Sequence, residues 1–172
     1  MSRPATTTDQ AATVNDLPAN AAGAPSVRVC QFIDEEPDAL LELYRHLHLT
    51  DPTPVTGERL REVWRQIRAD PNLLYVLAEV NGLPAATCTL TIVPNLTHGA
   101  RPYGVIENVV THPDLRRQGL GTAVLKAACE QAWNRSCYKV TLTTGRTDPG
   151  VHAFYAAAGF VTGVKTAYVA KP

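Results

Sequence analysis

Residues 106–122 read IENVVTHPDLRRQGLGT, and in this stretch the pattern of a strand changes to the pattern of a helix. Its first half is apolar and β-branched, as in a strand, and Pro113 closes that strand. A turn follows, and the glycines at 119 and 121 open a helical pattern. The first turn of a helix has unpaired N–H groups and the positive end of the helix dipole, so it favours an anion. Glycines there let a phosphate approach the backbone, and Arg116 and Arg117 add positive charge.

Two other phosphate-binding motifs do not fit this segment. A dinucleotide fingerprint, GxGxxG, needs a third glycine at position 124, where the chain has valine. A P-loop needs GxxxxGK followed by Ser or Thr, and Gly121 and Lys126 do not have that spacing. Two glycines alone are weak evidence, because glycines also let helices pack closely. The segment therefore indicates an anion site whose identity depends on the rest of the chain.

Strands and helices alternate on both sides of this segment. The pair Asn81-Gly82 stands between two apolar runs and signals a hairpin, because both residues accept a positive φ. The apolar periodicity predicts strands at 27–33, 73–80, 83–93, 103–112, 138–143 and 160–169, and helices at 36–47, 56–69, 119–134 and 149–158. This order predicts an α+β fold with a mixed, mostly antiparallel sheet of six to seven strands, flanked by helices.

A second motif lies about 30 residues after the glycines and reads DPGVHAFYAAAGF at residues 148–160. Taken with the first motif, it resembles the GNAT acetyltransferase superfamily. Residues 116–121 match that family's cofactor motif, which is Gln or Arg, two variable residues, Gly, one variable residue, and Gly or Ala. The pairs Phe154-Tyr155 and Gly159-Phe160 match its later signature. The resemblance covers residues 27–170 and implies the acyl-CoA N-acyltransferase fold.

The resemblance also implies which residues bind acetyl-CoA. The cosubstrate would lie in a V-shaped opening between the strand of Glu107 and the strand of Tyr138. Its pantetheine arm would pair with the backbone of Val109, Val110 and Thr111. Its pyrophosphate would be held by Arg116, Arg117, Gln118, Gly119, Leu120, Gly121 and Thr122. Family members often carry Asn seven residues before the tyrosine, where it contacts the cofactor arm. This chain has Asp148 there, which keeps a hydrogen-bond acceptor or caps the helix that follows.

Two side chains carry the predicted chemistry. Tyr155 would protonate the leaving thiolate as general acid, as the resemblance implies. An alkylamine acceptor is mostly protonated at neutral pH, so a base must remove a proton. Glu107 interrupts an otherwise apolar strand, and a carboxylate is rarely buried there without a role. The resemblance implies that it is the base, because the matching position is the base in many family members. The alternative is that Glu107 faces solvent or pairs with an arginine. His112 is a second candidate base past the strand end. Cys137 would offer an acyl-cysteine route, but a small buried thiol is the simpler interpretation.

We therefore expect an acetyl-CoA-dependent N-acetyltransferase that moves the acetyl group to a primary amine of a small molecule, by direct transfer in a ternary complex. Residues 137–142, CYKVTL, and residues 107–110, ENVV, resemble glucosamine-6-phosphate N-acetyltransferases. An amino-sugar phosphate is thus one expected acceptor, beside other small amines, antibiotics and peptide amines. Arg101 is a candidate partner for a phosphate or carboxylate. A non-catalytic acyl-CoA-binding or regulatory module on the same fold is the competing class.

Composition limits the partners. The 172 residues carry 16 Lys+Arg and 16 Asp+Glu, and this zero net charge argues against a nucleic-acid binder. No apolar run of about 18 residues predicts a membrane span. The four cysteines do not cluster like metal ligands, so we expect no metal and a reduced, cytoplasmic protein.

Residues 1–26 hold three charged residues and no aromatic, which predicts a disordered tail before one domain at 27–172. The resemblance also implies a homodimer.

Overall fold

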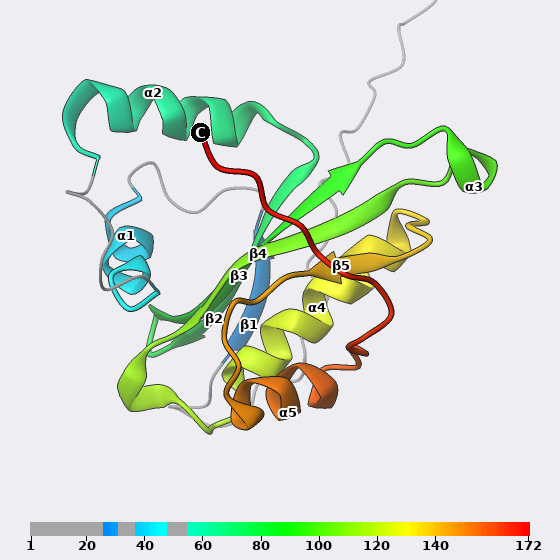
Figure 1. Cartoon of the computed structure of the whole chain (residues 1–172). Coiled ribbons are helices and arrows are strands. Elements are labelled where there is room, and N and C mark those ends of the chain that lie inside the picture. Colours follow the sequence, from blue (N-terminus) through cyan, green and yellow to red (C-terminus); the bar gives the residue numbers. More distant parts are fainter. Residues whose placement is uncertain (1–25, 31–36, 48–54) are drawn as a thin grey trace, which may run out of the picture.

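The computed structural model describes residues 26–30, 37–47 and 55–172. In these residues the chain forms one five-stranded sheet in the order β1-β2-β3-β4-β5, with helices on both faces (Figure 1). The strands are β1 (Ser26–Cys30), β2 (Leu73–Val80), β3 (Leu83–Val93), β4 (Tyr103–Thr111) and β5 (Val140–Leu142). The helices are α1 (Asp38–Tyr44), α2 (Gly57–Ala69), α3 (Thr97–Ala100), α4 (Leu120–Asn134) and α5 (Pro149–Ala157), with a 3-10 turn η1 (Pro113–Leu115).

The strand pairing confirms the predicted α+β class and the mixed, mostly antiparallel sheet. Strands β1 to β4 pair antiparallel with their neighbours, and β5 pairs parallel to β4. Residues 1–25 of the predicted tail lie outside the described residues, as do the end of the first expected strand and the loop before α2. Ser26, which the prediction assigned to the tail, pairs with Glu79 in β1.

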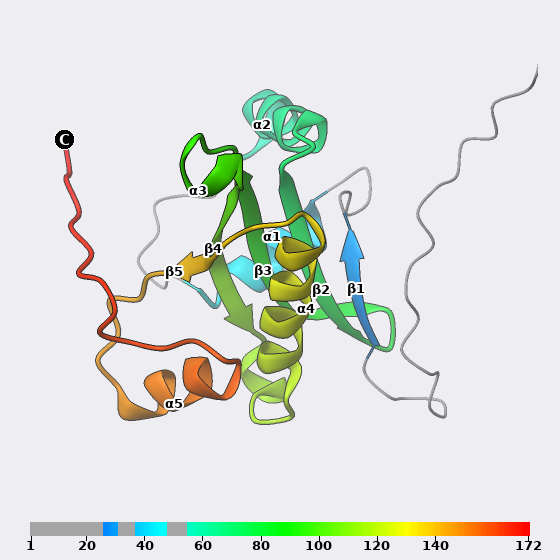
Figure 2. The ribbon, with the colours of Figure 1, turned by 90° about the vertical axis from the view of Figure 1, so that its right-hand side faces the viewer.

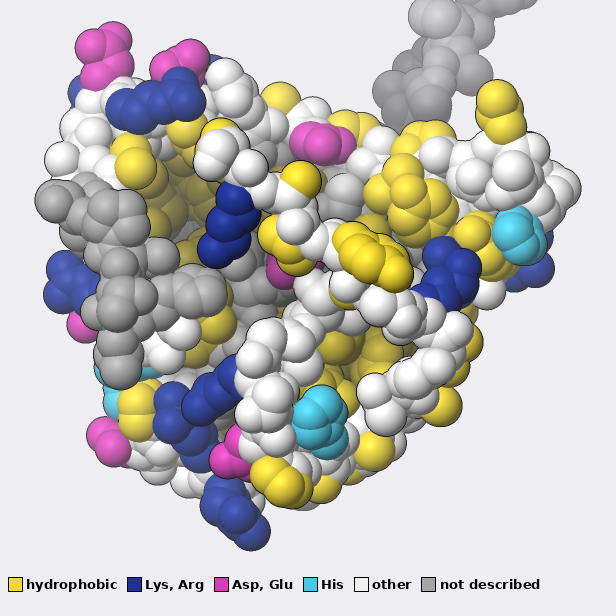
Figure 3. Space-filling model, in the orientation of Figure 1, with side chains coloured by type: hydrophobic (Ala, Val, Ile, Leu, Met, Phe, Trp, Pro, Cys, Tyr) yellow, Lys and Arg dark blue, Asp and Glu magenta, His cyan; other side chains and the backbone are white. Residues whose placement is uncertain are grey.

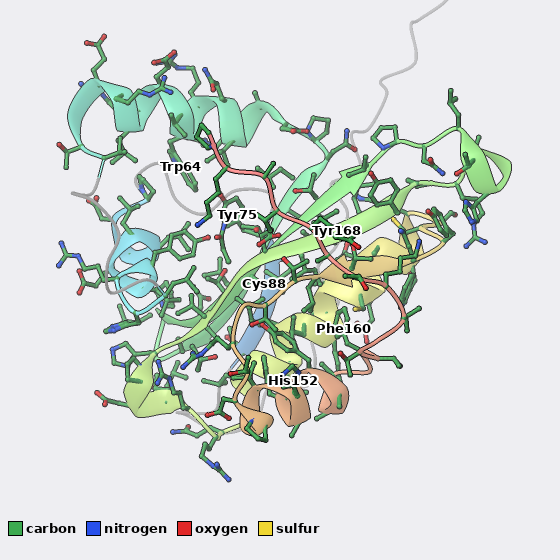
Figure 4. The ribbon with its side chains drawn as sticks, in the orientation of Figure 1. Trp64, Tyr75, Cys88, His152, Phe160 and Tyr168 are labelled. Atoms are coloured by element: carbon green, nitrogen blue, oxygen red, sulfur yellow. The ribbon has the colours of Figure 1, made fainter. Side chains whose placement is uncertain are left out.

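Strand β2 is buried on both faces, which explains its unbroken apolar run. Leu74 and Val76 face α4 in the main hydrophobic core. Tyr75 and Leu77 point to the opposite face, because successive side chains of a strand alternate. There Tyr75 meets Trp64 of α2 edge-on, with 5.9 Å between the ring centroids (Figure 4). The sheet therefore lies between α4 on one face and α1 with α2 on the other.

Strand β4 has a bulge at the point where the sheet opens. The pairing with β3 shifts there, so Asn108 and Val109 together face one residue of β3. Asn108 has a positive φ of 54°, a conformation that Asn tolerates better than most residues. A bulge bends its strand, and the pairing of β4 with β5 ends just before it, at Ile106. Beyond Ile106 the β5 side of β4 has no partner strand among the described residues, and an open V results.

The strand predicted at 160–169 does not form, so the described sheet has five strands rather than six or seven. After α5 the chain bends at residues 162–165, where Gly163 has a positive φ of 77°. From Val161 onward it makes no backbone hydrogen bond to another described residue. Its β-branched composition gives strand propensity, but a strand forms only where a partner strand accepts its hydrogen bonds. In Figure 2 this segment, drawn in red, stands apart from the rest of the molecule.

Candidate active site

The open V between β4 and β5 continues into a groove of about 910 Å³. Its walls come from the turn after α1, the second half of β4, the start of α4, the segment after β5, and α5. Its lining residues are 46–47, 106–111, 113, 116–117, 119–122, 143–146, 151 and 154–155. The groove therefore joins the two sequence motifs, which are separated by a helix and a strand along the chain.

One end of the groove is the N-terminus of α4. Gly119 precedes the helix with a positive φ of 83°, which glycine adopts without strain. No side chain caps this end, so the N–H groups of the first turn lack a side-chain acceptor. Arg116 and Arg117 are exposed beside them, and Figure 3 shows basic side chains gathered over the segment that joins β4 to α4. The free N–H groups, the helix dipole and two guanidinium groups favour a phosphate here.

Gly121 serves packing rather than backbone freedom. It is buried inside α4, and a Cβ added there would lie 3.0 Å from Phe154 Cε2 and 3.0 Å from Thr111 Oγ1. The missing side chain therefore lets β4 and α5 approach the start of α4. This contact physically joins the glycine motif to the Phe-Tyr motif and sets the position of Tyr155 on the groove.

Substituting Gly121 by alanine is expected to lower the free energy of unfolding by about 1–3 kcal/mol, because the added methyl group forces Phe154 and Thr111 apart. Gly145→Ala is the matched control, since Gly145 lines the same groove and a Cβ there meets nothing within 4 Å. Denaturant unfolding of both variants checks the difference. Equal stability of Gly121→Ala and the wild type would show that the contact is not tight.

Glu107 also lines the groove, on β4 directly before the bulge. It pairs with Thr89 of β3, which in turn pairs with Tyr75, so Glu107 is on the face of the sheet that carries α1. The Thr89 hydroxyl donates to the backbone carbonyl of Glu107 at 3.1 Å and fixes the strand there. Among the described residues Glu107 forms no ion pair, and its exposed side chain lines the groove. The arginine pairing considered from the sequence is therefore absent from the described part of the chain.

Tyr155 reaches the groove from α5, where it packs against the core on the α4 side of the sheet. Burial raises the pKa of Tyr155 above its ordinary value of 10.0, although a hydrogen bond with Thr144 and the charge of Arg146 oppose this shift. The negative charge of Glu107 also raises the Tyr155 pKa, which places the two groups within electrostatic reach of each other. The phenol is therefore protonated at neutral pH and has a proton to donate.

Most of the predicted site residues line this groove. They are Glu107, Val109, Val110, Thr111, Arg116, Arg117, Gly119, Leu120, Gly121, Thr122 and Tyr155. Gln118 and Asp148 do not line it. Asp148 caps α5 by accepting a hydrogen bond from the Gly150 N–H, and its contact with a cofactor stays a prediction. His112 lies past the end of β4, where its ring meets that of His46 edge-on.

Residues 143–146, which follow β5 and line the groove near Tyr155, were not among the predicted site residues. The signal was a polar TTGR run directly after an apolar strand, in a connecting segment of the kind that carries function.

Arg101, the predicted partner for a phosphate, is engaged elsewhere. Its guanidinium donates to the backbone carbonyls of Ser136 and Cys137, both at 3.2 Å. Arg146 is instead the guanidinium that lies on the groove beside Tyr155.

The described cysteines offer no activated thiol to the groove. Cys88, Cys129 and Cys137 are free, and none of them lines it. Burial raises the pKa of Cys137 and raises the pKa of Cys88 to about 12, so both stay as thiols.

Within the described residues no three His, Cys, Asp or Glu side chains are placed to hold a metal ion. None of the described helices combines the length and the apolar character that membrane spanning requires.

A mixed sheet that opens beside an uncapped helix N-terminus agrees with the fold expected from the two motifs. Residues 40–160 match the model of the acetyltransferase (GNAT) family, and the chain belongs to this family. It is therefore an acyltransferase.

Similar proteins and solved structures with acetyltransferase names support this family assignment. The chain is 32% identical over 127 residues to glucosamine 6-phosphate N-acetyltransferase from Trypanosoma brucei brucei, a match that covers 73% of this chain and 84% of that protein. A solved structure from Agrobacterium tumefaciens strain C58, provisionally named an acetyltransferase, is 45% identical with a TM-score of 0.78 and covers 86% of this chain and 99% of its own. An aminoglycoside N-acetyltransferase solved in complex with CoA shares the fold at 15% identity, with a TM-score of 0.69 and coverage of 89% and 98%.

Proposed function

We propose that this protein transfers the acetyl group of acetyl-CoA directly to the primary amine of an amino-sugar phosphate such as glucosamine 6-phosphate. The observation that carries the reaction is a single groove whose lining includes the uncapped N-terminus of α4 together with Glu107 and Tyr155. The name of the Trypanosoma relative supports the choice of acceptor. The CoA complex of a protein with the same fold supports the choice of donor.

The residues of the groove fit acetyl-CoA. The pyrophosphate would bind the unpaired N–H groups at the start of α4, with Arg116 and Arg117 adding charge. The pantetheine arm carries amide groups, and the open edge of β4 at residues 109–111 presents backbone groups without a strand partner on that side. When bound, the thioester supplies an acyl group that is activated toward amines.

Glu107 and Tyr155 would divide the proton transfers between them. Glu107 would accept a proton from the acceptor's ammonium group, directly or through a water, and so free the nitrogen lone pair. As the nitrogen bonds to the acyl carbon and the carbon–sulfur bond breaks, Tyr155 would give its phenolic proton to the leaving sulfur, and the second proton that the nitrogen loses on becoming an amide would restore the phenol through water. Glu107 belongs to the α1 face of the sheet and Tyr155 to the α4 side. The acceptor and the leaving sulfur would therefore meet in the opening between β4 and β5.

Thiol release from acetyl-CoA with a panel of amines tests this function. The panel contains glucosamine 6-phosphate, glucosamine, an aminoglycoside and a peptide amine. We expect saturable release of CoA, with the highest kcat/KM for glucosamine 6-phosphate. Tight binding of acetyl-CoA without turnover of any amine would instead favour the non-catalytic module. Turnover restricted to another amine would overturn the proposed acceptor and keep the reaction.

Arg146 is the cation that we assign to the acceptor's phosphate. We expect Arg146→Gln to raise the KM for glucosamine 6-phosphate about tenfold, because a charge-assisted hydrogen bond contributes roughly 1.5–3 kcal/mol and the site is open to water. The KM for acetyl-CoA and the rate with unphosphorylated glucosamine should not change. Lys126→Gln, at an exposed position of α4 outside the groove, is the control. An equal loss for both sugars would remove Arg146 from phosphate recognition.

A further inference from the structure

Thr144 follows β5 by two residues and lines the groove together with Tyr155. It belongs to the segment that runs from β5 to α5 in Figure 1. Its hydroxyl oxygen accepts the backbone N–H of Arg146 at 3.2 Å. Ser and Thr side chains form short turns of this kind with the backbone two residues further on. The turn therefore fixes the Thr144 hydroxyl at the wall of the groove.

The hydrogen bonds of the Thr144 hydroxyl can be assigned one by one, because the group has one hydrogen and two lone pairs. The N–H of Arg146 occupies a lone pair, and the hydrogen remains to be donated. Tyr155 forms a hydrogen bond with Thr144, and this bond lowers the pKa of Tyr155 against the effect of burial. A bond that favours the phenolate is one that the phenol oxygen accepts. Thr144 is therefore the donor and Tyr155 the acceptor.

This direction of the bond leaves the hydrogen of the phenol itself free. The aromatic neighbours of Tyr155 are Phe154 and Phe160, at 4.9 and 6.4 Å between ring centroids. Neither ring carries an oxygen or nitrogen that could accept the phenolic hydrogen. The groove lies on the remaining side, since Tyr155 lines it. The phenolic hydrogen is therefore available to a group bound in the groove.

We infer that Thr144 is a positioning residue for the proton donor, because its hydroxyl holds the Tyr155 oxygen and directs the phenolic proton into the groove. When Tyr155 gives that proton to the leaving sulfur, its O–H bond breaks, an S–H bond forms, and Thr144 keeps its own proton. The bond from Thr144 is then made to a charged oxygen, which strengthens it in the transition state. The inference rests on the proposed acetyl transfer and adds a residue to it.

Thr144→Val keeps the branched shape of the side chain and removes only the hydroxyl. We expect it to lower kcat about 10- to 100-fold, the usual effect of losing a hydrogen bond to a charged group, with little change in the KM for acetyl-CoA. Thr144→Ser keeps the hydroxyl and should retain most of the wild-type kcat. Thr141→Val is the matched control, since its hydroxyl donates to the carbonyl of Gly104 outside the groove.

A wild-type kcat in Thr144→Val would overturn the inference. So would a loss confined to the KM for glucosamine 6-phosphate, because the hydroxyl would then only hold the turn that carries Arg146. In a protein that already carries Tyr155→Phe, adding Thr144→Val should change kcat by less than about twofold, since no phenol is left to position. An equal fold-loss with and without the phenol would give Thr144 a separate role and overturn the inference.

A titration without substrate distinguishes failure of this inference from failure of the proposed function. The six tyrosines are replaced by 3,5-difluorotyrosine, whose fluorines lower the phenol pKa and report ionisation by ¹⁹F NMR, and Tyr155→Phe identifies the signal of residue 155. Loss of the donated bond should raise the pKa of residue 155 in Thr144→Val, and Thr144→Ser should restore it. An unchanged titration would overturn the inference whether or not an amine is acetylated. A shifted titration without turnover of any amine would support the hydrogen bond and overturn the proposed function.

Discussion

Replacing Tyr155 by phenylalanine is expected to lower kcat by about 10²- to 10⁴-fold with little change in the KM for acetyl-CoA. The substitution keeps the ring, which contacts Phe154 and Phe160 with 4.9 and 6.4 Å between centroids, so α5 should keep its position. The substitution removes the phenolic proton and the hydrogen bond with Thr144. Thiol release at saturating substrates measures kcat, and an unchanged unfolding temperature confirms that the variant is folded.

The pH dependence of kcat/KM distinguishes a Tyr155 that donates a proton from a Tyr155 that only packs against the core. Burial raises the pKa of Tyr155 above its ordinary value of 10.0, so the phenol stays protonated through neutral and mildly alkaline pH and its ionisation cannot lower the rate there. A rising pH also supplies more neutral amine. We therefore expect kcat/KM of the wild type to rise from neutral to mildly alkaline pH without a phenol-dependent fall. A wild-type rate in Tyr155→Phe, or a fall near neutral pH that this substitution abolishes, would contradict the assignment.

Replacing Glu107 by glutamine is expected to lower kcat/KM for the amine by about 10²-fold or more, because the amide cannot accept a proton. The bulge of β4 should survive, since Thr89 bonds to the backbone carbonyl of residue 107 and not to its side chain. Glu107 is exposed and forms no ion pair with the described residues, so the substitution leaves no buried charge without a partner. Initial rates at varied amine concentration measure the loss.

A rise in pH should partly restore the Glu107→Gln variant, because more of the acceptor then arrives as the neutral amine. A loss of packing or of acceptor binding would not recover in this way. Glu130→Gln, at an exposed position of α4 outside the groove, should retain wild-type rates and serves as the matched control. Unchanged activity of Glu107→Gln would remove Glu107 from the role of base and return attention to His112.

Local rules made several parts of the fold predictable. Asn81 and Gly82 have positive φ values of 53° and 77°, and the pairing of Val80 with Leu83 closes the two-residue hairpin that their identities indicated. The helix predicted at 119–134 begins at Leu120 with Gly119 as its N-cap. The two motifs that indicated an anion site and a proton donor meet on one groove, because Gly121 lets Phe154 pack directly against α4.

Other features depend on contacts between distant segments, which local sequence does not encode. The strand propensity of residues 160–169 is real, but no described strand edge of the same chain accepts it. The bulge at Asn108 arises from the register between β4 and β3. Arg101 was a plausible phosphate partner until the fold brought the carbonyls of Ser136 and Cys137 within its reach. The chain reversal after β5 likewise places Arg146 beside Tyr155.

Initial-rate kinetics with both substrates varied test direct transfer in this groove most directly. No described cysteine lines the groove, and burial raises the pKa of both Cys88 and Cys137, so the enzyme should not carry the acetyl group covalently. Reciprocal plots of rate against acetyl-CoA concentration, at several fixed concentrations of glucosamine 6-phosphate, should give intersecting lines. Intact-mass analysis after mixing with acetyl-CoA alone should show unmodified protein. Parallel lines together with an acetylated protein would contradict a ternary complex and place a covalent step in the reaction.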